Sequence, residues 1–335
     1  MQNPKKHIPF VSNTAVRACA KMNLLGASRI PFLFVIDYEM RQPLVFPLDD
    51  LEKAKVLYRI DGIGNFSSQN GVAHKPAAFE KHPVGFKVYL KAFNRVKTHL
   101  QRGNSFLVNL TQATPIEANL SLLEIFLRSQ SKYNLYVQDE FVVFSPETFV
   151  KIKNGIIYSY PMKGTISEHV SDAENLILKN PKEMAEHATI VDLIRNDLSV
   201  FSKNVTVNRF RYIDRIETNK GGLLQVSSEI SGELPEDYQN KIGNLLFDML
   251  PAGSVTGAPK PQTRQIIQES ENYERGYYTG VFGVFDGENL DSAVMIRFIE
   301  KTDLGLVFKS GGGITALSDA QTEYQEMIDK VYLPF

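Results

Sequence analysis

Pro161-Met162-Lys163-Gly164-Thr165 directly follows Ile156-Ile157-Tyr158-Ser159-Tyr160, a β-branched and aromatic run that is typical of a strand. Proline lacks the N–H that a strand needs and therefore ends it, whereas glycine lets the backbone turn sharply. We therefore expect Lys163 where a strand ends and a turn begins. A lysine held between rigid neighbours can serve as a nucleophile, although most lysines in such turns are simply solvated.

A carboxylate is expected near this lysine, across a hairpin. Residues 140–145 and 149–152 predict strands on either side of Pro146-Glu147, and residues 156–160 predict a third strand across the turn Lys153-Asn154-Gly155. A hairpin of this length returns the chain to where it began. We therefore expect Glu147 and Lys163 to share a cleft.

The composition limits the class of protein. The chain has 335 residues, of which 43% are hydrophobic and 22% charged, as in soluble globular proteins of one large domain or two. A net charge of −1 argues against a general surface for nucleic acid or anionic membranes. The single cysteine, Cys19, excludes an internal disulfide, and no signal-peptide run opens the sequence. We expect a cytoplasmic protein.

Strands outnumber helices along the chain. Strands are predicted at residues 31–36, 106–112, 135–137, 140–145, 149–152, 156–160, 205–216, 223–230, 281–285, 292–300 and 304–309. Helices are predicted at residues 14–22, 84–102, 122–129, 172–179, 182–198, 240–249, 261–271 and 322–331, and a loop at residues 62–71. Too few helical crossovers stand between strands for a doubly wound sheet, which favours an α+β arrangement.

Two predicted helices each carry glutamates three residues apart, Glu183 with Glu186 and Glu323 with Glu326. Residues at this spacing share a helix face, where like charges repel unless a cation bridges them. Carboxylates without a cluster of cysteine or histidine suit a hard ion such as Mg²⁺. Taken alone, the two pairs also fit solvent-exposed acidic faces.

Two features predict an anion site. The run Gly311-Gly312-Gly313 can expose consecutive N–H groups, an arrangement that binds carboxylate or phosphate. Arg297, at the end of a predicted strand at residues 293–296, can grip a carboxylate with two hydrogen bonds. The plain alternatives are an ordinary turn and a surface salt bridge.

Together, these stretches resemble the chorismate-utilising enzymes, the family of anthranilate synthase component I, aminodeoxychorismate synthase component I, isochorismate synthase and salicylate synthase. The resemblance covers about residues 80–335, in the family's order, and several stretches are too long to match by chance. The matching stretches are residues 145–147, 161–165, 182–187, 191–198, 251–260, 275–280, 296–297, 311–314 and 323–326. The resemblance implies one α+β chorismate-binding domain over residues 1–335, with two packed antiparallel sheets, outer helices and a shortened N-terminal part at residues 1–80.

The resemblance also implies roles in binding chorismate, which has two carboxylates and a 4-hydroxyl. One Mg²⁺ is implied at the ring carboxylate, held directly or through water by Glu183, Glu186, Glu323 and Glu326. The implied substrate-binding residues are Thr165, Thr256, Gly257, Ala258, Tyr278, Arg297, Gly311, Gly312, Gly313 and Lys330. Glu147 matches the general acid that helps the 4-hydroxyl leave, which requires a pKa raised by burial.

Lys163 separates the members of the family. Anthranilate synthases usually have alanine at the matching position, whereas aminodeoxychorismate synthases usually have a lysine that attacks C2 of the ring. Ammonia then adds at C4 and expels the lysine. The resemblance therefore implies an aminodeoxychorismate synthase component I that makes 4-amino-4-deoxychorismate for folate synthesis. The alternatives are an anthranilate synthase component I, an isochorismate or salicylate synthase, or a chorismate-binding subunit without catalysis.

Some features depart from the family pattern. Ile166-Ser167-Glu168 stands where Arg-Pro-Arg is usual, and Gln225 aligns with a family histidine. The serine-proline motif of tryptophan-inhibited members is missing, so no tryptophan feedback is expected. Cys19 lacks the surroundings of a glutaminase nucleophile, so ammonia is expected from solution or from a glutamine amidotransferase partner. Release of p-aminobenzoate is expected to need another protein.

Overall fold

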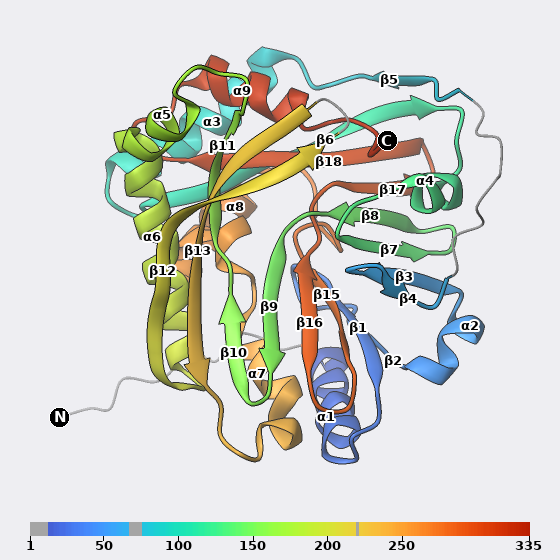
Figure 1. Cartoon of the computed structure of the whole chain (residues 1–335). Coiled ribbons are helices and arrows are strands. Elements are labelled where there is room, and N and C mark those ends of the chain that lie inside the picture. The colour runs from blue at the N-terminus through green and yellow to red at the C-terminus, as the bar shows by residue number, and fades with distance from the viewer. Residues whose placement is uncertain (1–12, 67–75, 219–220) are drawn as a thin grey trace.

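Two large antiparallel sheets and the helices around them make up the structure, a computed structural model that describes residues 13–66, 76–218 and 221–335 (Figure 1). The first sheet runs in the order β11 (Met162–Ser167), β13 (Gly221–Glu233), β10 (Ile156–Ser159), β9 (Thr148–Lys153), β16 (Leu290–Val294), β15 (Val281–Phe285), β1 (Phe32–Ile36) and β2 (Leu44–Pro47), with β12 (Lys203–Thr218) paired to β13. The expected α+β fold with two packed antiparallel sheets is confirmed.

The second sheet lies above the first in Figure 1. Its order is β14 (Gly257–Ala258), β6 (Leu107–Ala118), β18 (Gly305–Ile314), β17 (Phe298–Thr302), β8 (Phe141–Ser145), β7 (Tyr133–Val137), β3 (Val56–Ile60) and β4 (Ile63–Gly64), with β5 (Phe79–Lys81) paired to β6. The helices are α1 (Asn13–Ala27), α2 (Leu51–Ala54), α3 (Phe86–Gln101), α4 (Leu122–Arg128), α5 (Ala173–Lys179), α6 (Pro181–Ser199), α7 (Ile242–Met249), α8 (Lys260–Ser270) and α9 (Ala320–Asp329).

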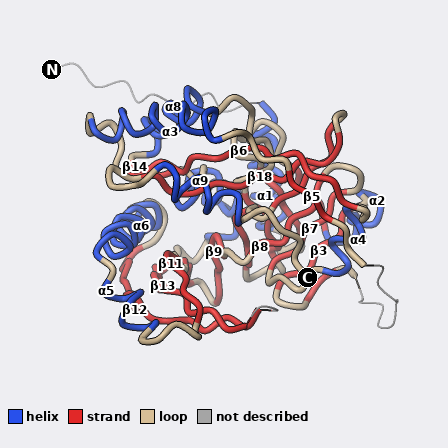
Figure 2. The backbone as a smooth tube through the Cα atoms, turned by 90° about the horizontal axis from the view of Figure 1, so that it is seen from above, coloured by secondary structure: helices blue, strands red, loops and turns tan. Residues whose placement is uncertain are grey.

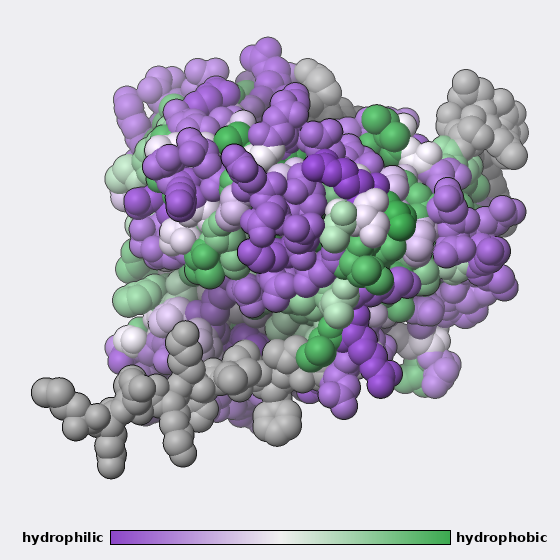
Figure 3. All heavy atoms as spheres, turned by 90° about the horizontal axis from the view of Figure 1, so that it is seen from below, coloured by the Kyte–Doolittle hydropathy of each residue, from purple (hydrophilic) through white to green (hydrophobic). Residues whose placement is uncertain are grey.

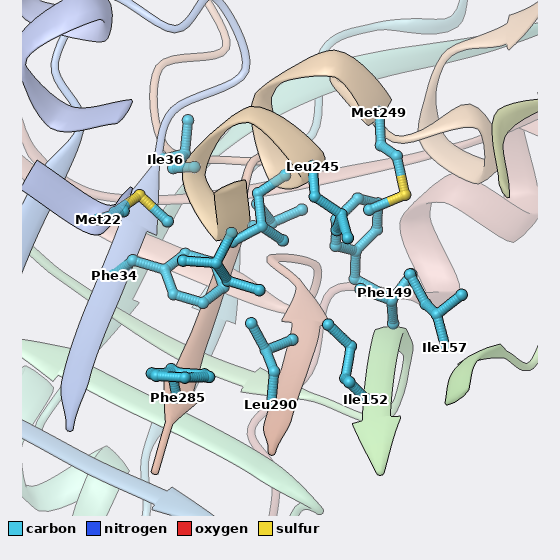
Figure 4. Close-up of a cluster of buried hydrophobic side chains, with 14 of the residues drawn as sticks. Met22, Phe34, Ile36, Phe149, Ile152, Ile157, Leu245, Met249, Phe285 and Leu290 are labelled. Carbon is cyan, nitrogen blue, oxygen red and sulfur yellow. The ribbon is translucent and has the colours of Figure 1, made fainter. Parts of the chain in front are cut away.

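Strand β1 shows how the layers are held together, because all five of its side chains are buried. Phe32, Phe34 and Ile36 belong to a cluster that includes side chains of α1 and α7, which Figure 4 shows from close by. Leu33 and Val35 point to the other face, into a cluster shared with β7, β8 and β17 of the second sheet. The first sheet is thus covered by helices on one face and by the second sheet on the other.

Local sequence signals explain the elements that carry the site. In the hairpin of β9 and β10, Asn154 (φ 52°) and Gly155 (φ 76°) take the left-handed conformation that a two-residue type I′ turn requires. The side chain of Asn180 caps α6 by accepting from the N–H of Glu183 (3.1 Å), and Asp319 caps α9 in the same way. The caps place one glutamate of each pair in a first helical turn, where the helix dipole favours negative charge.

The prediction of one strand at residues 292–300 is wrong. The chain leaves the first sheet after β16, passes through Met295-Ile296-Arg297 and enters the second sheet as β17. Arg297 makes this change of direction with a left-handed φ of 53°. Both halves of the segment are apolar, so composition alone does not show where the chain changes sheets. The predicted loop at residues 62–71 lies partly outside the described residues, and Ile63–Gly64 forms the short strand β4.

The surface seen from below is mostly hydrophilic, with hydrophobic residues in patches between polar ones (Figure 3). Among the described residues, no helix combines the length and the apolar character needed to cross a membrane.

Candidate active site

Helix α6 and strand β11 approach α9 and β18 (Figure 2). Residues of these four elements line a cavity of about 1170 Å³. Thirteen predicted site residues, drawn from segments far apart in the sequence, line it. They are Glu147, Lys163, Thr165, Glu183, Glu186, Tyr278, Arg297, Gly311, Gly312, Gly313, Glu323, Glu326 and Lys330. Glu147 and Lys163 therefore share a cleft, as the predicted hairpin indicated.

Lys163 lies within strand β11 rather than at the start of a turn, so that expectation is wrong. The pairing of β11 with β13 shifts register between Met162 and Thr165, and Gly164 in this bulge has a φ of 77°. The bulge directs Lys163 into the cavity, where its Nζ lies 3.3 Å from Glu186 Oε2. A Cβ added to Gly313 would lie 2.9 Å from the same Nζ, so this glycine leaves room for the amine.

Glu147 projects into the cavity from the link between β8 and β9. Its backbone is fixed by two hydrogen bonds, from its N–H to Ser145 Oγ (3.1 Å) and from the N–H of Val294 to its carbonyl (3.1 Å). Burial raises the pKa of the carboxyl group, and the hydrogen bond from Ser254 Oγ to Oε1 and the positive charge of Lys163 oppose that rise. A raised pKa suits a group that has to give up a proton.

The three glycines lie near the end of strand β18, so the alternative of an ordinary turn is wrong. Residues 311–313 pair with residues 109–111 of β6, while the pairing of β18 with β17 stops at Lys309. Beyond Lys309, one edge of β18 is therefore open. A Cβ added to Gly311 would lie 2.5 Å from Leu110 O, so the strand pairing itself requires glycine at that position.

The direction of the amides follows from the pairing. The N–H groups of Asn109 and Thr111 donate to acceptors on the side of β6 that faces away from β18. Gly313 and Gly311 of β18 lie directly opposite Asn109 and Thr111. In an antiparallel pair, when one of two opposite residues points its N–H and C=O away from the partner strand, the other does so too. The N–H groups of Gly311 and Gly313 thus face the open edge, and Gly311 O accepts from Lys330 Nζ there (2.9 Å). Alternate amides, rather than three consecutive ones, are placed to meet an anion.

The four glutamates line the cavity from two helices. Glu186 on α6 and Glu323 on α9 are nearly buried, with 7% and 5% of their surface exposed. A Cβ added to Gly312 would lie 3.6 Å from Glu323 Oε2 and 3.8 Å from Glu326 Oε1, so the α9 glutamates approach β18 to within ordinary van der Waals contact of this position. An all-oxygen, negatively charged donor set of this kind fits a hard divalent cation that keeps part of its water.

The glutamates do not converge on one point. Among the described residues, the group of three possible ligands whose atoms lie within 4.8 Å of one another is Glu80, His82 and Glu117, which is exposed on β5 and β6. Lys330 Nζ lies 2.7 Å from Glu326 Oε1 and balances the negative charge of one carboxylate of the α9 pair. Lys163 balances one charge of the α6 pair in the same way. Burial lowers the pKa of Lys330, and Glu326 opposes that shift.

Three predicted substrate-binding residues do not line the cavity. Thr256 is buried and its hydroxyl donates to Ala252 O (2.8 Å), while Gly257 and Ala258 form β14 and pair with β6. Two residues of the same family stretch, Ser254 and Val255, line the cavity instead. The stretch itself therefore pointed to the site, but the residues within it that reach the cavity depend on the short helical turn Gly253–Val255.

Sequence reasoning missed further residues of the cavity wall, among them Asn109, Tyr332 and the hydroxyl of Ser254. Gln225, which stands where the family has histidine, lines the cavity from β13 opposite Thr165. No motif pointed to Tyr332. Asn109 lies on a predicted strand, but only the order of strands in the sheet shows that this strand runs beside the three glycines.

A buried histidine anchors α6 behind the site. His187 Nε2 lies 2.6 Å from Ser228 Oγ on β13, and that oxygen already accepts from the N–H of Arg211 (2.9 Å). The hydroxyl proton of Ser228 therefore points to Nε2. Burial lowers the pKa of His187 to about 4, so the imidazole is neutral at physiological pH. This contact fixes the helix turn that carries Glu186.

The comparison with solved structures concerns the fold. The structure is similar to MenF, the menaquinone-specific isochorismate synthase from Escherichia coli, with a TM-score of 0.73 at 15% identity over 96% of this chain and 81% of that chain. At this identity the likeness shows the fold alone.

The sequence comparisons show the family. The model of the chorismate binding enzymes matches residues 51–334, and this chain belongs to that family. An uncharacterized PabA-like protein of Haemophilus influenzae is 51% identical over 312 residues, which cover 93% of this chain and 94% of that protein.

Named synthases are more distant. Anthranilate synthase component 1 of Acetivibrio thermocellus is 34% identical over 70% of this chain and 50% of its own length. Aminodeoxychorismate synthase component 1 of Bacillus subtilis is 30% identical over 73% of this chain and 54% of its own length. The chain thus spans about half the length of these two relatives, and their identities do not separate the two activities.

Proposed function

We propose that this protein is the aminating component of an aminodeoxychorismate synthase, which converts chorismate and ammonia to 4-amino-4-deoxychorismate and water. The observation that carries the proposal is Lys163, whose amine reaches into the cavity that Glu147 also lines. An amine nucleophile divides one difficult substitution into two easier ones.

In the proposed first step, Lys163 Nζ forms a bond to C2 of the ring. The ring double bonds shift, the C4–O bond breaks and Glu147 donates the proton with which the hydroxyl leaves as water. The attacking amine has to be neutral, so the ammonium group first passes one proton to solvent, which ends its ion pair with Glu186. The raised pKa of Glu147 supports its role as the acid.

In the proposed second step, ammonia forms a bond to C4, the double bonds shift back and the C2–N bond to Lys163 breaks. The excess proton of the added ammonia returns to Glu147, so the enzyme regains its starting state. Ammonia comes from solution or from a glutamine amidotransferase partner. The site is proposed to work in the cytoplasm, on the branch of metabolism that supplies folate.

Substrate recognition is proposed to use both sides of the cavity. Arg297, Tyr278 and the outward amides of Gly311 and Gly313 face the enolpyruvyl carboxylate, and Lys330 adds positive charge. Glu183, Glu186, Glu323 and Glu326 are proposed to hold Mg²⁺. When bound, this ion supplies positive charge for the ring carboxylate.

A product assay tests the proposal. The purified chain is incubated with chorismate, Mg²⁺ and an ammonium salt at mildly alkaline pH, and the products are separated by mass and retention. We expect 4-amino-4-deoxychorismate from the wild type, none from Lys163→Ala, and undiminished product from Lys153→Ala, a control at an exposed lysine of the neighbouring hairpin.

Anthranilate synthase is the second candidate, favoured by the 34% identity to the Acetivibrio enzyme. Anthranilate as the product would establish it and would mean that one lysine does not determine where ammonia adds. Isochorismate or salicylate would point to water as the nucleophile. Chorismate binding without turnover would indicate a subunit that keeps the fold and not the catalysis.

A further inference from the structure

The segment after α9 folds against the second sheet and presents one side chain to the cavity. Val331 is buried in the cluster of β8, β18 and α4, and Leu333 and Phe335 pack on the same cluster. Tyr332, which lies between these apolar side chains, lines the cavity instead.

Several contacts hold this segment in place. Lys81 Nζ donates to Ile328 O (2.7 Å) and to Val331 O (3.2 Å). The guanidinium of Arg128 lies 3.8 Å from the centre of the Phe335 ring. The ring of Tyr332 itself packs edge-on against Phe144, with 6.3 Å between the centroids. The tyrosine is therefore held on one side by Phe144 and by its anchored neighbours, while 41% of its surface stays exposed.

The hydroxyl of Tyr332 engages Arg297. Nε–H of Arg297 donates to this oxygen at 3.1 Å, and the guanidinium carbon lies 5.5 Å from the centre of the tyrosine ring. Within the described ranges, no hydrogen bond or ion pair joins the two terminal nitrogens of this arginine to a protein acceptor. Its backbone is restrained as well, because the N–H of Phe144 donates to Arg297 O (3.1 Å).

We infer that Tyr332 is a positioning residue for substrate recognition: by occupying Nε, it turns the Nη1–Nη2 edge of Arg297 toward the cavity. That edge offers two parallel N–H donors, which match a carboxylate. An arginine without this support samples several rotamers, and binding has to restrict them. The inference rests on the proposed contact of Arg297 with a chorismate carboxylate, and it is independent of which product the enzyme makes.

The first test compares three variants by the Kd of chorismate with Mg²⁺, measured by calorimetry in the Lys163→Ala background, which cannot form the proposed covalent bond. Tyr332→Phe keeps the ring and removes the hydroxyl, so we expect Kd to rise about tenfold and, in the enzyme that keeps Lys163, KM to rise about tenfold with kcat within about twofold of the wild type. Tyr332→Ala also removes the ring and raises Kd further. Tyr324→Phe is the control: it also removes a tyrosine hydroxyl, one that donates to Val84 O (2.6 Å) outside the cavity, and it leaves Kd unchanged.

A double-mutant cycle tests whether the tyrosine acts through the arginine. Arg297→Ala raises Kd, and adding Tyr332→Phe to it has no further effect if Arg297 carries the whole contribution. An unchanged Kd for Tyr332→Phe, an unchanged Kd for Arg297→Ala, or an equal effect of Tyr332→Phe in both backgrounds would overturn the inference. Failure of the proposed function is a separate result, because it shows in the product and not in these dissociation constants.

Discussion

Two lysines face the same cavity, each beside one glutamate of an acidic pair, but they are held differently. Lys330 Nζ lies 2.7 Å from Glu326, one turn earlier on the same helix, and also donates to Gly311 O at 2.9 Å. Lys163 reaches Glu186 from a different element, at the longer distance of 3.3 Å, and extends from a bulge.

The difference suggests different tasks. Lys330 has a carboxylate and a carbonyl as close acceptors, so its ammonium group is fixed as a charge in the cavity wall. The ion pair of Lys163 joins two elements, and the glycine at position 313 leaves space at its amine. Lys163 therefore suits a covalent step, and Lys330 suits electrostatic recognition.

The largest expected effect comes from removing the nucleophile. Lys163→Ala should lower the rate of amination by about a thousandfold or more, because the single difficult substitution is restored. Calorimetry should show that this variant still binds chorismate in the presence of Mg²⁺. Amination at the wild-type rate would mean that Lys163 has no more chemical role than Lys330.

Removing the acid should have the next largest effect. Glu147→Gln should lower kcat by about a hundredfold to a thousandfold, since the leaving hydroxyl no longer receives a proton. In the wild type, kcat should fall as pH rises through the raised pKa of Glu147, because only the protonated form is active. This decline should be absent from the pH–rate profile of the variant.

The same shift has a consequence for stability. The pKa of Glu147 is higher in the folded chain than in the unfolded chain, so its contribution to stability is present at low pH and is lost as pH rises through the folded value. At neutral pH, Glu147→Gln should therefore raise Tm while it removes activity. A lower Tm in thermal unfolding would contradict the burial of an unfavourable charge at this position.

Metal dependence tests the two acidic pairs together. Chelation should abolish turnover and Mg²⁺ should restore it. Glu186→Gln and Glu323→Gln, one from each helix, should each weaken Mg²⁺ activation by about tenfold to a hundredfold. Glu117→Gln, in the exposed group on β5 and β6, is the control and should leave activation unchanged. Full activity in chelator would refute the metal site.

Lys330→Met keeps most of the side-chain volume and removes the charge. We expect about a tenfold higher Kd for chorismate and an unchanged product, because Lys330 contributes charge and no bond. A loss of amination with normal binding would show that the contrast between the two lysines is mistaken.

The smallest expected effect is at Ser254. Its hydrogen bond lowers the pKa of Glu147, so Ser254→Ala should move the alkaline decline of kcat to higher pH and lower kcat by about threefold. Ser254→Thr, which keeps a hydroxyl, should restore the wild-type profile. If the alkaline decline of kcat occurs at the same pH in Ser254→Ala as in the wild type, Ser254 does not influence the pKa of Glu147.

The sequence predicted much of this site because its motifs combine residue type with local spacing. The glutamate pairs depend only on helical spacing, and the hairpin between Glu147 and Lys163 depends on an Asn-Gly turn. Both kinds of signal are local. They predicted a cleft shared by the acid and the lysine, and one helix face for each glutamate pair. The resemblance to the family brought the six residues to one site, and all six line the cavity.

The rest depended on pairings between distant segments. Three consecutive glycines argue against a strand, yet Gly311, Gly312 and Gly313 form one because they pair closely with β6. The left-handed Arg297 has no sequence signal, because left-handed residues are usually glycine or asparagine. The contacts of Ser254 with Glu147 and of Tyr332 with Arg297 join segments that are far apart in the sequence.

The central claim is a bond between Lys163 and the ring, and mass spectrometry of the digested protein tests it most directly. The enzyme is mixed with chorismate and Mg²⁺ without ammonia, quenched with acid and digested. We predict a mass increase of one chorismate minus one water on the peptide that contains Lys163, and none in Lys163→Ala. Wild-type enzyme that makes 4-amino-4-deoxychorismate when ammonia is added, yet shows no such adduct when ammonia is withheld, would contradict the account.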